Sequence, residues 1–191
     1  MKSGPSMLES RPRFYALLVV TFIMGVAWIV VSAADEAQTT SGQIPSPRQG
    51  FLAPDFSLNT LEGQQITLSE LRGDPIIVNL WASWCPPCRA EMPAIQKVYD
   101  QNQARGLQVL AVNMTYQDSE TAAEAFVQEY ELSFPVLLDM TGMVGNGYQM
   151  RALPSTYFID REGIIQQVII GGPMSEATLQ SAVEALFEGG S

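Results

Sequence analysis

Apolar residues fill one long stretch near the start of the chain. The 18 residues Phe14–Val31 carry no charge, and only Thr21 and Gly25 interrupt the apolar run. As a helix rising about 1.5 Å per residue, this stretch would measure roughly 27 Å, close to the ~30 Å hydrocarbon core of a bilayer. The pattern predicts a transmembrane signal-anchor at residues 14–34.

The charges on either side of this stretch predict its orientation. Arg11 and Arg13 precede it. Asp35 and Glu36 follow it. The positive-inside rule therefore predicts that residues 1–13 form a cytoplasmic tail and that the rest of the chain beyond the anchor lies outside the cytoplasm.

A cleaved secretory signal is the alternative interpretation of the same segment. Residues 31–33, Val-Ser-Ala, resemble a small-residue cleavage site, although an apolar run of 18 residues exceeds the usual ~7–15 of such signals. Cleavage after Ala33 would release a secreted or periplasmic protein. Both interpretations predict export of the chain beyond residue 34.

The remaining chain divides into a polar segment and a patterned one. Residues 35–50 are polar and rich in Ser, Thr, Pro and Gly, which predicts a flexible linker. Residues 51–191 carry the apolar patterns of one folded domain.

Three kinds of pattern predict the elements of this domain. Two short runs flank Glu62-Gly63 and indicate a β-hairpin. Continuous apolar runs indicate strands buried on both faces, and stretches with one apolar face indicate helices. The predicted strands are 56–59, 65–68, 76–81, 107–113, 136–138, 156–160 and 164–170, and the predicted helices are 86–104, 119–130, 142–149 and 175–187.

The order of these elements predicts the fold class. A strand at 76–81, a helix at 86–104 and a strand at 107–113 imply a right-handed crossover and a parallel pair of strands. The last two strands flank Arg161-Glu162-Gly163 and form an antiparallel hairpin. We therefore expect an α/β fold with a central mixed β-sheet flanked by helices.

Composition and charge narrow the function. Hydrophobic residues make up 47% of the chain and charged residues 16%, as in globular proteins. From Ala34 onward, seven basic residues stand against 19 acidic ones, a net charge of −12, which disfavours nucleic acid as a partner. The chain has no histidine and two cysteines, which excludes an imidazole base, a Cys-His pair and a histidine-ligated metal. We expect neither a cofactor nor a metal.

The two cysteines form a C-x-x-C motif at a predicted strand-to-helix junction, the arrangement of redox-active pairs. Cys85 lies at the helix N-terminus, where free N–H groups and the helix dipole lower the pKa of a thiol, so it is the expected nucleophile. Cys88 lies one turn further on and is the expected resolving cysteine. Pro86 and Pro87 fall in the first turn, where proline is tolerated.

Two other interpretations of the cysteine pair are weaker. A purely structural disulfide that closes four residues would stabilise the fold by only roughly 2 kcal/mol, against ~4.7 kcal/mol for a hundred-residue loop. A metal site would need more ligands, because two thiolates without histidine do not complete a tetrahedral shell. Dithiol–disulfide exchange is therefore the favoured chemistry.

Several motifs in a specific order resemble the thioredoxin-like proteins, and within them the membrane-anchored TlpA/ResA group, which is CcmG-like. The likeness extends from about Ala53 to Leu186. It rests on Ala53-Pro54-Asp55-Phe56, on residues 79–93 (NLWASWCPPCRAEMP), on Phe134-Pro135-Val136 and on residues 153–160 (LPSTYFID) with Gly163. The resemblance further implies a helix–strand insert at 116–138, in addition to the N-terminal β-hairpin that the pattern predicts.

The resemblance also implies roles for individual residues. Pro154 matches the cis-proline that faces the cysteine pair, and the backbone of Leu153 would hydrogen-bond an extended substrate. Trp84, with the Pro86-Pro87 turn, would form part of the docking surface.

Glu91 matches an acidic residue that the group places near the cysteines to set their pKa and to handle protons. Its i, i+3 spacing from Cys88 supports this role, because the two share a helix face. The alternative is an exposed first-turn glutamate that complements the helix dipole. Asn79 departs from cytoplasmic thioredoxins, which have a buried aspartate at this position, and the departure shifts proton handling onto Glu91.

The function that the resemblance implies is reduction of disulfides in exported proteins. Apocytochrome c or copper-site proteins are the implied clients, a CcdA/DsbD-like membrane protein is the implied electron donor, and a monomer is expected. A disulfide-forming oxidase or isomerase is the alternative, because direction depends on reduction potentials that range from about −270 to about −120 mV.

Two further functions are disfavoured because the chain lacks the motifs that they require. A peroxidase of the peroxiredoxin type would need threonine where Ala82 stands. A copper metallochaperone of this family would need C-x-x-x-C and a histidine.

Overall fold

The computed structural model describes residues 15–25, 28 and 44–188. The chain forms two units, Met1–Thr40 and Ser41–Ser191. In the first unit, residues 15–25 and 28 are helical, and the rest of the anchor predicted at 14–34 lies outside the described residues. Within the described part of the chain, no helix is both long enough and apolar enough to cross a membrane.

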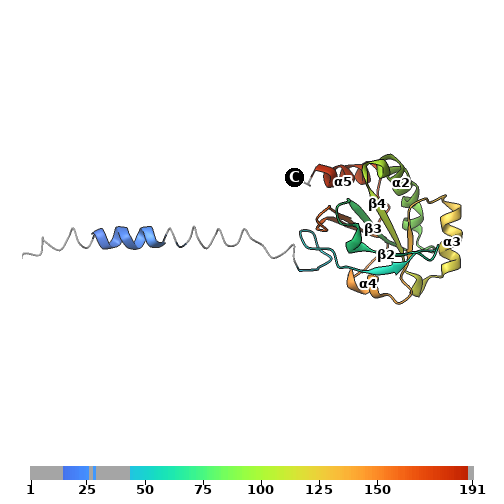
Figure 1. Ribbon diagram of the computed structural model, residues 1–191, viewed down its shortest axis with the longest axis horizontal. Coiled ribbons are helices and arrows are strands. Elements are labelled where there is room, and N and C mark those ends of the chain that lie inside the picture. The colour runs from blue at the N-terminus through green and yellow to red at the C-terminus, as the bar shows by residue number, and fades with distance from the viewer. Residues whose placement is uncertain (1–14, 26–27, 29–43, 189–191) are drawn as a thin grey trace, which may run out of the picture. The chain divides into compact units, whose positions relative to one another are not determined.

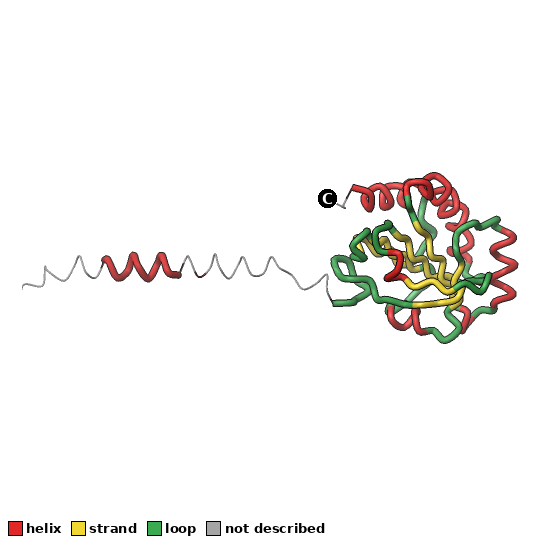
Figure 2. Tube along the Cα trace, in the orientation of Figure 1, coloured by secondary structure: helices red, strands yellow, loops and turns green. Residues whose placement is uncertain are grey.

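The second unit is built on a five-stranded sheet in the order β5-β4-β3-β6-β7 (Figures 1 and 2). β3 pairs with β4, and β4 with β5, in parallel, whereas β3–β6 and β6–β7 are antiparallel. The predicted mixed sheet is therefore confirmed. Its strands are β3 (Ile76–Trp81), β4 (Gln108–Asn113), β5 (Val136–Leu138), β6 (Ser155–Ile159) and β7 (Ile165–Ile170).

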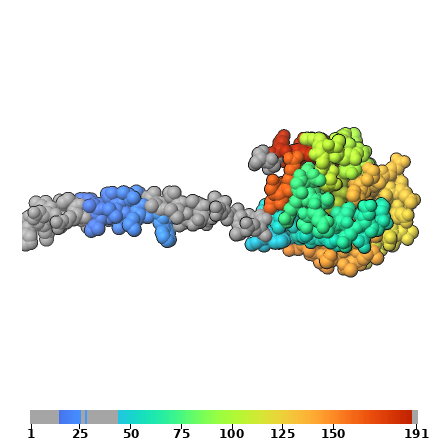
Figure 3. Space-filling view, viewed as in Figure 1, coloured from blue at the N-terminus to red at the C-terminus, as the bar shows by residue number. Residues whose placement is uncertain are grey.

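Helices cover both faces of this sheet (Figure 1). Three of them bury their apolar residues in one core: α2 (Pro86–Asn102), α3 (Glu120–Glu129) and α5 (Glu176–Glu188). The opposite core receives α4 (Met143–Gly147) and the hairpin of β1 (Ser57–Asn59) and β2 (Gln65–Thr67). Figure 3 shows the hairpin beside α4 on the surface of this layer.

β3 explains how the two cores form from one strand. All six of its residues are buried, and alternate side chains enter opposite cores, Ile77 and Trp81 on the side of α2 and Val78 and Leu80 on the other. A continuous apolar run is therefore required here, because both faces of a central strand are covered. Asn79 is the exception, a fully buried polar residue on the α2 side.

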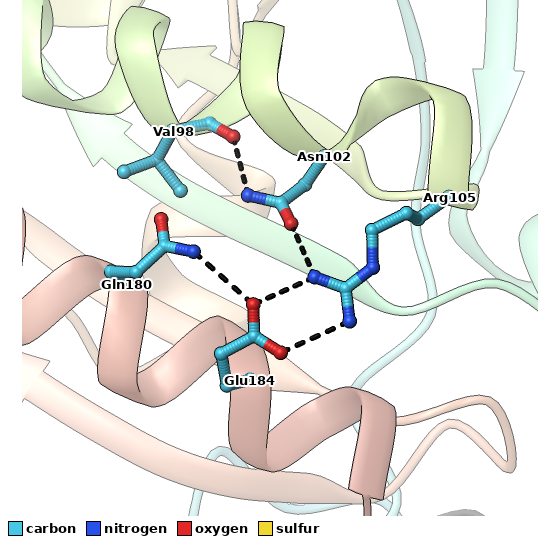
Figure 4. A network of polar contacts seen from close by, with 5 residues as sticks. All are labelled: Val98, Asn102, Arg105, Gln180 and Glu184. Atoms are coloured by element: carbon cyan, nitrogen blue, oxygen red, sulfur yellow. Dashed lines mark hydrogen bonds and ion pairs between the residues drawn. The ribbon is translucent and has the colours of Figure 1, made fainter.

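The far end of α2 is tied to α5 by a polar network (Figure 4). Arg105, in the short 3₁₀ helix η3 (Gln103–Arg105), binds Glu184 through two N–O contacts of 2.6 and 3.0 Å. Arg105 also donates to Asn102, whose amide donates to the carbonyl of Val98. Exposed ion pairs stabilise a fold by roughly 0–1 kcal/mol. The buried apolar contacts between α2 and α5 therefore provide most of the stability of this helix pair.

The predicted elements are all present, with shifts at their ends. β2 stops at Thr67, and Leu68 begins a 3₁₀ helix, η2 (Leu68–Leu71). The expected N-cap of α3 is confirmed, because Oγ of Ser119 accepts a hydrogen bond from the Ala122 N–H at 3.1 Å. The helix predicted at 142–149 shortens to α4, and Gln149 after it has a left-handed φ of 49°.

Residues 44–50 are the described part of the predicted linker. The N–H of Ser46 donates to the carbonyl of Leu52, and the N–H of Gly50 donates to that of Ile165. The second of these bonds attaches the segment to the first residue of β7.

Candidate active site

The two cysteines occupy the N-terminus of α2. Cys85 is its N-cap, and Pro86 and Pro87 form the first turn. Cys85 and Cys88 are joined by a disulfide, with their Cα atoms 5.3 Å apart, and the N–H of Cys88 points at Sγ of Cys85 at 3.3 Å. Cys85 is 2% exposed and Cys88 is completely buried. A thiolate at position 85 would therefore face the free N–H groups of the helix.

A groove of about 320 Å³ opens beside Cys85. Trp84, Pro86, Pro87 and Leu153 all line it. Trp84 is 55% exposed, and its indole N–H donates to the carbonyl of Gln117 at 3.0 Å. The residues expected to contact a substrate are thus gathered around the cysteine.

The other wall of the groove comes from the loop before β6. The Leu153–Pro154 peptide bond is cis, and Pro154 is buried and is not among the residues that line the groove. Among the described residues, none hydrogen-bonds to the backbone N–H or carbonyl of Leu153. These two groups remain available to an extended polypeptide, as in the addition of a strand to an open edge.

Glu91 lies inside the protein, so the exposed first-turn interpretation is wrong. Its side chain is completely buried. Oε1 accepts a hydrogen bond from Nδ2 of Asn79 at 2.9 Å, and Oε2 accepts one from the Met174 N–H at 3.2 Å. Burial raises the pKa of Glu91 above its ordinary value, and the two hydrogen bonds only partly oppose this effect.

Asn79 connects Glu91 to the sheet. It lies opposite Thr156 in the β3–β6 pair, and its Nδ2 donates to Oγ1 of Thr156 at 2.8 Å as well as to Glu91. The site where cytoplasmic thioredoxins have a carboxyl therefore holds an amide that donates to the carboxyl on α2.

Asp118 was not anticipated from the sequence. It follows the short helix η4 (Thr115–Gln117) and accepts hydrogen bonds from the backbone N–H and hydroxyl of Ser83 and from Nδ2 of Asn113. Partial burial acts to raise the pKa of Asp118, but these hydrogen bonds outweigh it and the pKa lies below its ordinary value. Nothing in the local sequence marks this residue, because its partners come from separate elements.

Arg89 joins the same region to α3. Nη2 of Arg89 lies 2.6 Å from Oε1 of Glu129, and its guanidinium lies 5.3 Å from the ring centroids of Phe126 and Tyr130. Nη1 also donates to the carbonyl of Ser83 at 3.3 Å. The insert thus contacts the helix and the loop that carry the cysteines.

Gly172 closes the site on the side of Glu91. A methyl group at this position would lie 2.7 Å from Oε2 of Glu91 and 2.8 Å from Cγ of Pro154. The Gly172–Pro173 bond is a second cis bond, which the sequence did not indicate. Only a residue without a side chain allows the 171–174 loop to approach this closely.

The chain is similar to known proteins in sequence and in fold. The sequence model of the AhpC/TSA family matches residues 50–168. The chain belongs to this family. Its sequence is 41% identical to the thioredoxin-like protein YneN of Bacillus subtilis over 135 residues, covering 70% of this chain and 78% of the relative.

Other relatives place the chain among the thioredoxin-like thiol–disulfide oxidoreductases of the ResA group. The thiol-disulfide oxidoreductase ResA of Halalkalibacterium halodurans is 32% identical over 183 residues, which cover 94% of this chain and 98% of the relative. The crystal structure of a putative thiol:disulfide interchange protein DsbE from Chlorobium tepidum has a TM-score of 0.65 and 30% identity, covering 71% of this chain and 94% of the other. The expected family and its thioredoxin-like fold are confirmed.

Proposed function

We propose that this member of the family reduces disulfides in exported proteins, with Cys85 as nucleophile and Cys88 as resolving cysteine. The position of Cys85 carries the proposal. It is the N-cap of α2 and lines a groove whose opposite wall, at Leu153, offers an unpaired backbone N–H and carbonyl. A nucleophile and a docking edge therefore face one substrate.

The exchange proceeds through two displacements. In the reduced protein, the Cys85 thiolate attacks one sulfur of the client disulfide, forms a mixed disulfide and releases the second client sulfur as a thiolate. Cys88 then loses its proton and attacks Sγ of Cys85, forming the 85–88 disulfide and releasing the first client sulfur. The client gains two electrons, and the protein is oxidised by two.

Glu91 is proposed to exchange the proton of Cys88. It is buried one turn beyond Cys88 on α2, and its pKa is raised. A carboxyl group with a raised pKa is better matched to a thiol, whose ordinary pKa is about 8.5, than an exposed one. Asn79 and the Met174 N–H hold the two oxygens in place.

The location of the reaction is proposed to be outside the cytoplasm, with the chain held by the segment at 14–34. The apolar pattern and the flanking charges of this segment support an anchor. The similarity to ResA of Halalkalibacterium halodurans, which extends over 94% of this chain, is consistent with a common organisation. Cleavage after Ala33 is the alternative.

The proposed partners derive from the ResA likeness. A CcdA/DsbD-like membrane protein would return two electrons to the 85–88 disulfide. Apocytochrome c and copper-site proteins are the proposed clients, since both carry cysteine pairs that must be reduced before they bind haem or copper.

The reduction potential of the full-length chain, equilibrated with glutathione buffers, tests the direction of the reaction. A potential near the approximately −270 mV of thioredoxin would support a reductase. A potential near the approximately −120 mV of DsbA would overturn this direction and favour a disulfide-forming oxidase. Titration of the reduced chain with Cu(I) tests the metallochaperone alternative. A dissociation constant weaker than micromolar would exclude it.

A further inference from the structure

A second pocket, of about 260 Å³, lies next to the groove of Cys85. Arg48 and Arg151 line it together with Tyr148, Tyr157 and Ile170, and none of its lining residues is acidic. Arg151 also lines the groove that contains Cys85 and Leu153. The two cavities therefore adjoin at Arg151, and we call the second one the arginine pocket.

The two guanidinium groups place positive charge together in an otherwise acidic protein. The chain has a net charge of −10. The ion pairs in the described part of the chain use Arg89, Lys97 and Arg105. Within that part, neither Arg48 nor Arg151 makes a side-chain hydrogen bond or an ion pair.

Two positive charges at one pocket attract an anion despite the acidity of the whole chain. The Debye length is about 8 Å at physiological ionic strength, so nearby charges dominate over distant ones. A guanidinium group also offers paired N–H donors that match the two oxygens of a carboxylate. The local preference of this pocket is therefore opposite to that of the protein as a whole.

The two tyrosines of the pocket do not neutralise the positive charge of the arginines. The hydroxyl of Tyr148 donates to the carbonyl of Pro54, and the hydroxyl of Tyr157 donates to the carbonyl of Tyr148, each at 2.9 Å. The two rings meet edge to face, with centroids 4.7 Å apart. Desolvation raises the pKa of both hydroxyls, and the negative charge of Asp55 raises that of Tyr148 further, so both hydroxyls stay neutral. Among the residues that line the pocket, the charged ones are Arg48 and Arg151.

The position of Arg151 relates this pocket to a bound client. A client strand that pairs with the free backbone of Leu153 passes beside Arg151, two residues earlier in the same loop. An extended chain advances about 3.3 Å per residue. Client side chains about two to five residues from the reactive cysteine lie roughly 7–17 Å from it along the strand, and this is the range in which we expect the carboxylate to lie.

We propose that Arg151 and Arg48 bind a carboxylate side chain of the client, so that the protein prefers disulfides flanked by Asp or Glu. This inference rests on the proposed exchange at Cys85 and adds the class of substrate. The occupant is a polypeptide carboxylate, because the pocket continues from the groove in which the client cysteine reacts.

Reduction of matched peptides by the full-length chain tests the preference. Each peptide carries one intramolecular disulfide and has Glu, Gln or Lys at a single position, which is moved from two to five residues away from a cysteine. Reduction of the same peptides by dithiothreitol corrects for effects of the charge on the disulfide itself. We expect the Glu peptide to react about two- to fivefold faster than the Gln peptide at its best position, with the ratio falling as salt is added.

Variants that each remove one positive charge test whether Arg151 and Arg48 cause the preference. Arg151→Gln is expected to remove most of the preference for Glu, and Arg48→Gln a smaller part of it. Arg72→Gln is the control, because Arg72 is also exposed but precedes β3, at the opposite end of that strand from Cys85. An unchanged ratio in Arg151→Gln, or an equal loss in Arg72→Gln, would refute the proposal. If the parent protein reduces none of the peptides, the proposed function itself fails.

An anionic lipid headgroup is the competing occupant. Binding of the parent and of Arg48→Gln/Arg151→Gln to vesicles with and without phosphatidylglycerol distinguishes it. A lipid-specific loss in the double variant, with an unchanged peptide preference, would assign the pocket to lipid and overturn the proposal. Equal vesicle binding by the two proteins, with a lost peptide preference, would support it.

Discussion

The carboxylate of Asp118 accepts two hydrogen bonds from Ser83, one from its backbone N–H at 2.6 Å and one from its hydroxyl at 2.7 Å. Ser83 lies two residues before Cys85, and the residue before Asp118, Gln117, accepts the indole N–H of Trp84. The segment after β4 thereby holds the segment that precedes the nucleophile.

Replacement of Asp118 by Asn should loosen this attachment. We expect a loss of about 1–3 kcal/mol in the free energy of unfolding, because the hydrogen bonds to a charged acceptor are weakened. Slower reaction of reduced Cys85 with a small disulfide should accompany it, and stopped-flow measurement checks this rate. Glu124→Gln, which removes an exposed carboxylate from α3, is the charge control.

The same variant should change the response to acid. Since the pKa of Asp118 is lowered in the folded protein, its contribution to stability is present above the ordinary value of ~3.9 and is lost as the pH falls through the lowered pKa. The difference in unfolding free energy between parent and Asp118→Asn should therefore shrink at acidic pH. A constant difference would contradict this account.

Glu91→Gln should show the opposite pH dependence. The pKa of Glu91 is raised by burial, so its contribution to stability is complete below the ordinary value of ~4.3 and is lost as the pH rises through the raised pKa. The free energy of unfolding of the parent minus that of the variant should decrease as the pH rises above about 4. Denaturant titrations of the oxidised proteins measure this difference, because the disulfide keeps the thiols from titrating. A difference that rises with pH would show that the charge of Glu91 does not destabilise the fold.

Gly172→Ala should displace the 171–174 loop. The added methyl group would overlap Oε2 of Glu91 and Cγ of Pro154, and overpacking of this kind costs about 1–3 kcal/mol. We expect loss of the Met174–Glu91 hydrogen bond and slower disulfide exchange, which denaturation and insulin reduction would detect. Gly147→Ala is the matched control, because a methyl group there meets no atom within 4 Å, and equal effects of the two variants would rule out the steric account.

Replacement of each cysteine by serine should impair the reaction at a different step. Cys85→Ser should abolish insulin reduction because the nucleophile is lost. Cys88→Ser should retain the first displacement and accumulate mixed disulfides with clients, because the resolving thiol is missing. Non-reducing electrophoresis and mass spectrometry identify these adducts, and full activity in either variant would show that the roles are wrongly assigned.

The strand and helix that hold the two cysteines were predictable from local sequence patterns. The strand at Ile76–Trp81 is recognisable as a buried apolar run, and Pro86-Pro87 marks the start of the helix after it. These features depend on strand burial and first-turn geometry, which short stretches of sequence encode. The sequence therefore sufficed to place Cys85 at a helix N-terminus and Cys88 one turn inside it.

Tertiary structure decided what surrounds those cysteines. Spacing put Glu91 on the face of Cys88, but its burial depends on Asn79 from β3 and on the loop at Gly172. The attachment of Ser83 to Asp118 and the shared pocket of Arg48 and Arg151 likewise join residues 35 and 103 positions apart. Such contacts arise only when separate elements pack together, so no local pattern in the sequence could reveal them.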